Sequence, residues 1–142
     1  MAVWDIKERN NLVRANDNRP DRLVEMGGFE PGHTANGSFI TMTSSGDSSD
    51  FGDLAKPRTL FGGAAASSST RGLFYGGEAP GNVTDIDSIT MASTGNASDH
   101  GDLTTAVGYA ASTSNGIRAL VAGGNSVINV IGHGSIASTG NF

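Results

Sequence analysis

Residues 71–77 are Arg-Gly-Leu-Phe-Tyr-Gly-Gly, and this stretch decides the fold because its pattern occurs three times. An arginine, a short and mostly apolar run and two glycines return at 22–28 and at 118–124. The double glycines are spaced by 49 and then by 47 residues. Self-similarity at a fixed period of this length indicates a repeat architecture. The sequence therefore predicts repeats of about 48 residues.

Two more blocks recur in the same order. Ile-Thr-Met-Thr-Ser-Ser-Gly at 40–46 matches Ile-Thr-Met-Ala-Ser-Thr-Gly at 89–95, and an echo, Ile-Ala-Ser-Thr-Gly, stands at 136–140. Asp-Phe-Gly-Asp-Leu at 50–54 returns as Asp-His-Gly-Asp-Leu at 99–103. Three blocks that keep one order and one period are not expected by chance, even in a chain rich in glycine and serine.

Each block is typical of β-structure. The apolar runs closed by Gly-Gly indicate strands that end in a turn, and the alternation at 40–43 and 89–92 is the period-2 pattern of a half-buried strand. The small-residue segments 58–67 and 104–112 fit tightly packed strands, and Asn115-Gly116 predicts a hairpin. Each unit is thus predicted to be a strand, a hairpin turn, the Gly-Gly strand, a loop, the Ile-Thr-Met strand and an Asp-rich turn. These elements form an antiparallel sheet of three to four strands, with at most one helical turn in the chain, within residues 5–14.

The composition also favours an all-β chain. Glycine makes up 21 of 142 residues, and hydrophobic residues make up 37%. Because glycine costs about 1 kcal/mol per helical position, a large helical core is excluded. The chain has no cysteine, which excludes disulfides and thiolate metal sites. It has no apolar run near the roughly 20 residues of a membrane-spanning helix, and its first residues lack the apolar stretch of a secretory signal.

The charge is acidic and uneven. The formal net charge is −5; residues 1–22 carry +1 and residues 23–142 carry −6. An acidic body does not attract a phosphate backbone. The expected partners therefore include neither nucleic acid nor a membrane.

A unit of this size and content is typical of one β-propeller blade, and the Gly-Gly strand resembles that of kelch repeats, although the kelch tryptophan is missing. A closer resemblance is to kelch-like repeat proteins encoded by tailed bacteriophages, many of them marine. Their repeated pattern is similar to Gly76-Gly77, Pro80, Ile86-Asp87 and the run from Ile89 to Thr104. The resemblance covers roughly residues 22–142. It implies an all-β chain of two to three kelch-like, β-propeller-type repeats, and a structural protein of the virion.

The repeat divides the chain into an N-terminal arm, 1–21, and a kelch-like domain, 22–142, with units at about 22–70, 71–117 and, in part, 118–142. The arm is polar and could be a disordered tail or a segment that orders on a partner. We favour the second interpretation because tryptophan is over-represented at binding hot spots. The candidate assembly residues of the arm are Trp4, Ile6, Leu12 and Val13.

The arginines of the repeat, Arg22, Arg71 and Arg118, have two interpretations. They could form a ring of guanidinium groups that binds an anion, or each could tie its unit to an acidic turn of a neighbour. Asp53 and Asp102 recur at the same period and supply partners for the second interpretation, which we favour.

The paired glycines are expected to serve the backbone, because glycine permits a positive φ and a close approach of strands. These repeat glycines are Gly27, Gly28, Gly76, Gly77, Gly123 and Gly124.

Acidic residues surround the glycine of the second repeated block. Carboxylates on a tight loop could bind Ca²⁺, and Asp47, Asp50 and Asp99 are the weak candidates. The favoured interpretation is that these side chains cap their own turn through backbone N–H groups two residues on. No metal or other cofactor is therefore expected.

No catalytic motif accompanies these residues. The three histidines, His33, His100 and His133, lie at unlike positions of the repeat, and no nucleophile elbow, phosphate loop or zinc-protease motif occurs. The sequence therefore does not predict an enzyme.

Two function classes remain. The first is a virion protein of the tail, baseplate or fibre, anchored by the arm; the second is a capsid-surface decoration protein. An enzyme that cleaves, or a protein that binds, host surface glycan is a third class, supported by the acidic turns alone. The expected partners are other virion proteins, the chain itself and, in the third class, a host glycan.

The Gly-Gly strand occurs three times and the acidic block twice, so the last repeat is incomplete. Because repeat units bury their apolar faces only against neighbours, we expect the chain to associate with copies of itself. A propeller needs about four to eight blades. The phage resemblance favours three copies.

Overall fold

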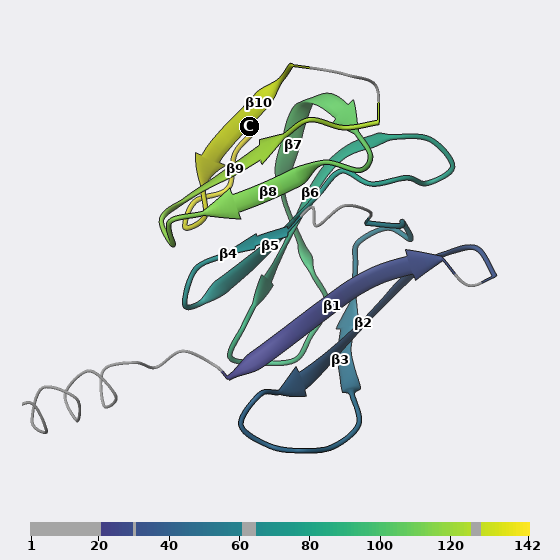
Figure 1. The fold of residues 1–142 in the computed structure, drawn as a ribbon, viewed down its shortest axis with the longest axis vertical. Helices are drawn as coiled ribbons and strands as arrows, with labels where there is room; N and C mark the ends of the chain where they lie inside the picture. The colour runs from purple at the N-terminus through teal and green to yellow at the C-terminus, as the bar shows by residue number, and fades with distance from the viewer. Residues whose placement is uncertain (1–20, 30, 61–64, 126–128) are drawn as a thin grey trace, which may run out of the picture.

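The computed structural model describes residues 21–29, 31–60, 65–125 and 129–142. In these residues the chain forms three small antiparallel sheets and no helix (Figure 1). The all-β prediction is therefore confirmed. The predicted assembly residues of the arm, from Trp4 to Val13, lie outside the described residues.

The first sheet has the order β1-β2-β3. Its strands are β1 (Arg22–Phe29), β2 (His33–Thr41) and β3 (Ser49–Asp53). Leu23 opposes Ile40 and Val24 opposes Phe39, so apolar side chains lie on both faces of this sheet.

The middle sheet has four strands, one more than either of the other sheets, in the order β4-β5-β6-β7. Its strands are β4 (Ala65–Ser67), β5 (Arg71–Tyr75), β6 (Val83–Thr90) and β7 (Ser98–Val107). The third sheet has the order β10-β9-β8. Its strands are β8 (Ala111–Ser114), β9 (Arg118–Ala122) and β10 (Ile131–Ser135).

The predicted hairpin joins β8 to β9. The Asn115 N–H donates to the Arg118 carbonyl at 3.2 Å, and Gly116 has a φ of 85°. The Asn115 side chain accepts hydrogen bonds from the N–H groups of Ile117 and Arg118, which fixes the turn. This prediction is confirmed.

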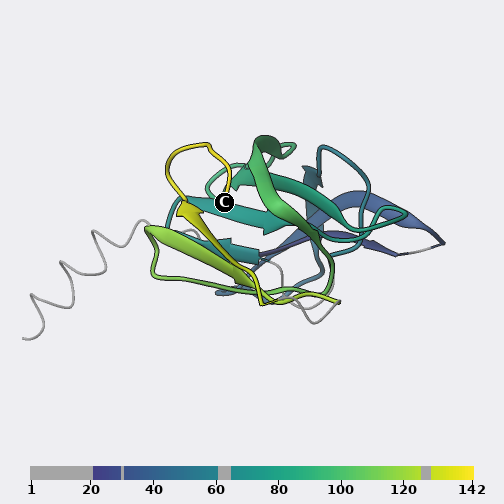
Figure 2. The same cartoon turned by 90° about the horizontal axis from the view of Figure 1, so that it is seen from above.

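The three sheets are stacked, with the middle sheet between the other two (Figures 1 and 2). One apolar cluster fills the contact between the first and middle sheets, which we call the first joint: Met26, Phe51, Leu54, Phe74 and Ile89. A larger cluster fills the second joint, between the middle and third sheets: Ala66, Leu73, Tyr75, Ile86, Leu103, Val107, Ala110, Ala119, Val121, Ile136 and Phe142. The core therefore lies between repeats rather than inside them.

The sheets divide the chain differently from the predicted units. The boundaries placed near 70 and 117 fall inside the β4–β5 and β8–β9 hairpins, because the middle and third sheets each begin one strand before the Gly-Gly strand. The acidic block was expected to be a turn, and this is wrong. Asp50 to Asp53 lie in β3, and Asp99 to Asp102 lie in β7.

Candidate functional site: the joints between the sheets

The double glycines allow the chain to approach a backbone carbonyl. Gly27 and Gly76 have φ angles of 71° and 53°. A Cβ atom on Gly27 would fall on the Arg58 carbonyl oxygen, and one on Gly76 would fall on that of Val107. Glycine is thus required twice at the same place in the repeat.

In the first two pairs, the second glycine donates a hydrogen bond to the same carbonyl. The Gly28 N–H donates to the Arg58 carbonyl at 3.1 Å, and the Gly77 N–H donates to the Val107 carbonyl at 2.8 Å. Gly123 has a φ of 74°, but a Cβ atom there would meet no atom within 4 Å. Among the described residues, Gly123 therefore has the conformation of Gly27 and Gly76 without their close approach to a carbonyl oxygen.

The acidic block of the first sheet binds the turn that follows β6. The Gly95 N–H donates to the Phe51 carbonyl and the Ala97 N–H to the Asp53 carbonyl, both at 2.7 Å. The Asn96 side-chain oxygen accepts from the Asp53 N–H at 3.1 Å. Three hydrogen bonds thus join the outer strand of one repeat to a turn of the next.

The second joint repeats this arrangement. The Gly140 N–H donates to the His100 carbonyl at 2.8 Å, and the Phe142 N–H donates to the Asp102 carbonyl at 2.9 Å. The Asn141 side-chain oxygen accepts from the Asp102 N–H at 3.0 Å. The block Thr-Gly-Asn and the block Asp-x-Gly-Asp are therefore the two halves of one contact between repeats.

The glycine inside the acidic block leaves room for this contact. A Cβ atom on Gly52 would lie 2.5 Å from the Gly95 carbonyl carbon, and one on Gly101 would fall on the Gly140 carbonyl oxygen. Both residues also have a positive φ, 129° and 143°.

The repeat arginines also connect neighbouring sheets, but through partners other than those expected. Arg22 donates to the Met91 carbonyl at 3.3 Å. Arg71 donates to the carbonyls of Ile136, at 3.1 Å, and Ala137, at 2.8 Å. For Arg22 and Arg71 the prediction of acidic side-chain partners is wrong, because each guanidinium group donates to backbone carbonyl oxygen just after a strand.

The remaining predicted residues of this set are exposed. The Arg118 side chain is exposed on the third sheet. Asp53 is exposed too, whereas the Asp102 carboxylate accepts from the Thr84 hydroxyl at 3.0 Å.

Small residues bring β4 and β8 together at the second joint. The Ser112 hydroxyl donates to the Ala65 carbonyl, and the Ser114 hydroxyl donates to the Ser67 carbonyl at 2.6 Å. Each serine bonds the residue 47 positions earlier, which occupies the same place in the preceding repeat.

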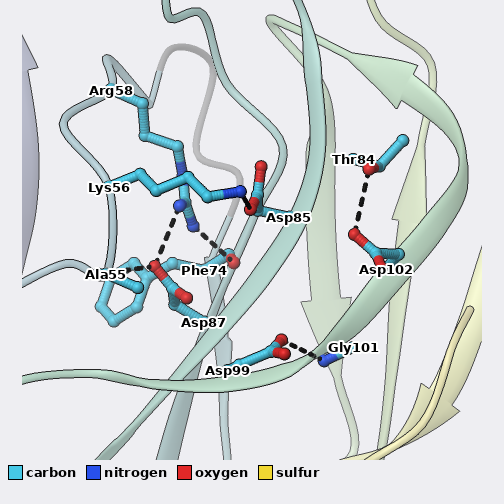
Figure 3. A network of polar contacts seen from close by, with 10 residues as sticks. All are labelled: Ala55, Lys56, Arg58, Phe74, Thr84, Asp85, Asp87, Asp99, Gly101 and Asp102. Carbon is cyan, nitrogen blue, oxygen red and sulfur yellow. Dashed lines mark hydrogen bonds and ion pairs between the residues drawn. The ribbon is translucent and has the colours of Figure 1, made fainter.

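A buried ion pair distinguishes the first joint (Figure 3). Arg58 donates to the Asp87 carboxylate at 2.9 Å, and the same carboxylate accepts from the Ala55 N–H at 3.2 Å. Arg58 also donates to the Phe74 carbonyl at 3.4 Å. This pair could not be found from the repeat pattern because it occurs in one joint only. At the position equivalent to Arg58, 49 residues later, the second joint has Val107.

A second, exposed ion pair lies beside it. The Lys56 ammonium is 2.5 Å from the Asp85 carboxylate (Figure 3). Partial burial by itself would raise the pKa of Asp85, but the hydrogen bond and positive charge of Lys56 outweigh it and lower that pKa. The hydrogen bond and negative charge of Asp85 raise the pKa of Lys56.

His100 lies in the second joint and is 1% exposed. Its Nε2 atom is 3.1 Å from the Ser135 carbonyl, and its ring meets that of Phe142 edge-on. Burial lowers its pKa, and the bond to Ser135 opposes this in part. Burial also raises the pKa of Tyr75, whose ring packs against Phe142. These aromatic contacts fix the last residue of the chain.

The weak metal candidates are dispersed. Asp47 and Asp50 are exposed, and Asp99 accepts from the Gly101 N–H two residues on, at 3.0 Å, as expected of a capping aspartate. In the described part of the chain, no group of three His, Asp or Glu side chains is arranged to hold a metal ion.

A surface groove of about 520 Å³ lies at the ends of the three sheets. Among the described residues its lining has no carboxylate and consists of Arg22, Ser67, Ser68, Ser69, Met91, Asn115, Gly116 and Ile117. Glycoside hydrolysis generally uses two carboxylates. This groove therefore does not supply the acid–base pair that a glycan-cleaving enzyme needs.

No protein-family model and no curated protein matches the chain. Within the described residues, no helix is long and apolar enough to cross a membrane.

The hydrogen bonds described above make the contacts between one repeat and the next the candidate functional site.

Proposed function

We propose that the protein is a structural component of a bacteriophage virion, associated with the tail, baseplate or fibre. In this proposal its sheets are kelch-like, propeller-type repeats that act as an assembly module, and copies of the chain associate, with three copies favoured by the phage resemblance. The arm, residues 1–21, attaches the module to other virion proteins. The proposal includes no catalytic step and no cofactor.

One observation carries this proposal. The run that resembles the phage repeat, Ile89 to Thr104, contains residues that connect the sheets: the Gly95 N–H donates to the Phe51 carbonyl, and the Asn96 side chain accepts from the Asp53 N–H. The repeated sequence is thus explained by contacts between successive units. A module of this kind supports a structural role.

Particle composition tests the proposal. The chain should be detected by mass spectrometry in purified particles of the phage that encodes it, at the low copy number of a tail protein. Deletion of residues 1–20 should leave a folded β protein that no longer enters particles. A copy number in the hundreds would instead assign it to the capsid surface as a decoration protein, and normal incorporation of the deletion variant would refute the role of the arm.

A further inference from the structure

The two outer faces of the stack expose residues at repeat positions whose equivalents are buried in the inner joints. Equivalent positions are 49 residues apart in the first and middle sheets; they are 47 apart between β5 and β9, and 45 apart between β6 and β10. We call the side of a sheet that meets the preceding repeat its front face, and the side that meets the following repeat its back face.

The front face of the first sheet is exposed and carries apolar side chains, with Glu25 beside them. Leu23 is 59% exposed and Met42 64% exposed, and Ile40 lies beside Leu23 on the neighbouring strand. In the middle sheet, the equivalent of Ile40 is Ile89, which the first joint buries. In the third sheet, the equivalent of Met42 is Ile136, which is 1% exposed.

The back face of the third sheet is exposed in the same way. Leu120 is 40% exposed and Ile131 63% exposed. Their equivalents in the middle sheet, Leu73 and Ile86, are completely buried because the third sheet covers them. One end of the stack thus offers an uncovered front face, and the other end offers an uncovered back face.

The polar contacts of the joints point to the same pairing. Arg22 and Arg71 each donate to a carbonyl of the following repeat, at Met91 and Ile136. Arg118 is the next arginine of the series, and its side chain is exposed. Met42 is the equivalent of Met91 in the first sheet, and it too is exposed. A donor and an acceptor of one repeated bond therefore lie at opposite ends of the stack.

We propose that the back face of the third sheet binds the front face of the first sheet of a second copy, head to tail, with the Arg118 guanidinium donating to the Met42 carbonyl of that copy. The contact reproduces the arginine bond and apolar packing of the two joints inside the chain, whereas the bonds to an acidic block have no counterpart because the third sheet lacks that block. A heterologous contact of this kind closes into a ring or continues as a filament. The inference deepens the self-association in the proposed function, and it is tested in solution, where the virion role has no influence.

Two matched variants of the full chain test this joint by sedimentation velocity at micromolar concentration. Leu23→Glu places a charge on the front face, and Leu120→Glu places one on the back face. Each variant alone should be monomeric, with the dissociation constant raised more than about tenfold, because a carboxylate would be buried without a partner. An equal mixture of the two should form a 1:1 dimer, since one intact front face and one intact back face remain. Ile117→Glu, an exposed apolar residue of the β8–β9 turn, should associate as the wild type does.

Other outcomes overturn the proposal. A monomeric wild type would show that a second copy does not cover these faces. Association of Leu120→Glu alone would indicate front-to-front or strand-edge pairing, and a mixture that stays monomeric would exclude the head-to-tail contact. Circular dichroism checks that the variants fold; Met42→Glu and Ile131→Glu form a second pair with the same expected results. A wild type that enters particles but stays monomeric in solution would refute this inference and leave the virion role intact. A wild type that associates head to tail but is absent from particles would refute the virion role alone.

Discussion

The Arg58 guanidinium donates a 2.9 Å hydrogen bond to the Asp87 carboxylate, and both side chains are buried in the first joint. The pair connects the segment after β3 to strand β6, so it holds two repeats together. A buried charge of this kind is sensitive to the loss of its partner.

Asp87→Asn should therefore lower the free energy of unfolding by about 3–5 kcal/mol, because it leaves the Arg58 charge buried and uncompensated. Urea denaturation measures this change. Asp85→Asn is the matched control on the same strand, and it should cost much less because its partner Lys56 is exposed. Equal effects of the two substitutions would contradict the importance of burial.

His100 should make the stability depend on pH. Its pKa in the folded protein lies below the ordinary value of 6.5. As the pH falls below about 6.5, the unfolded chain binds a proton that the folded chain resists, so the free energy of unfolding decreases by at most about 1.4 kcal/mol per pH unit. The effect is absent above that pH, where the imidazole is neutral in both states.

His100→Phe introduces the residue that the first repeat carries at this position, Phe51. When the free energy of unfolding is measured by denaturation between pH 7 and pH 5, its decrease with falling pH should be smaller for this variant than for the wild type. The same slope in both proteins would mean that His100 does not carry the pH dependence.

Gly101→Ala should disrupt the second joint. The new Cβ atom would fall on the Gly140 carbonyl oxygen, and alanine is strained at a φ of 143°. A destabilisation of about 1–3 kcal/mol is expected from the clash. Hydrogen exchange should speed up at the Gly140 and Phe142 amides. Gly32→Ala, where a Cβ atom would meet nothing within 4 Å, should change neither quantity.

The repeat arginines should differ in their effects. Arg71→Ala removes two hydrogen bonds to backbone carbonyls and should cost about 1.5–3 kcal/mol in thermal or urea denaturation. Arg118→Ala should leave the stability of the dilute monomer unchanged, while it weakens self-association. A large loss of monomer stability in Arg118→Ala would place this side chain inside the fold rather than at its end.

Much of this architecture could be predicted from periodicity. The repeat of Arg71, Gly76 and Gly77 located three strands, and Asn115-Gly116 located a hairpin, because these signals are local in the chain. The acidic block was assigned to a turn because Asp and Gly favour turns. It lies in strands instead, since a turn of the next repeat supplies its hydrogen bonds.

Contacts between distant residues were not predictable in this way. The partner of Arg71 is a backbone oxygen 65 residues away, and backbone oxygens carry no sequence signal. Asn96 and Asn141 did recur within the repeated block, so their shared role could have been found from the pattern. Arg58 and Asp87 gave no such signal because they belong to one joint alone.

An experimental structure of the assembled wild-type protein tests the central claim most directly. The account predicts that the Arg118 guanidinium lies about 3 Å from the Met42 carbonyl oxygen of the adjacent copy, a normal hydrogen-bond distance, with Leu120 and Leu23 buried between the two copies. A structure in which Arg118 faces solvent, or in which two front faces meet each other, would contradict it.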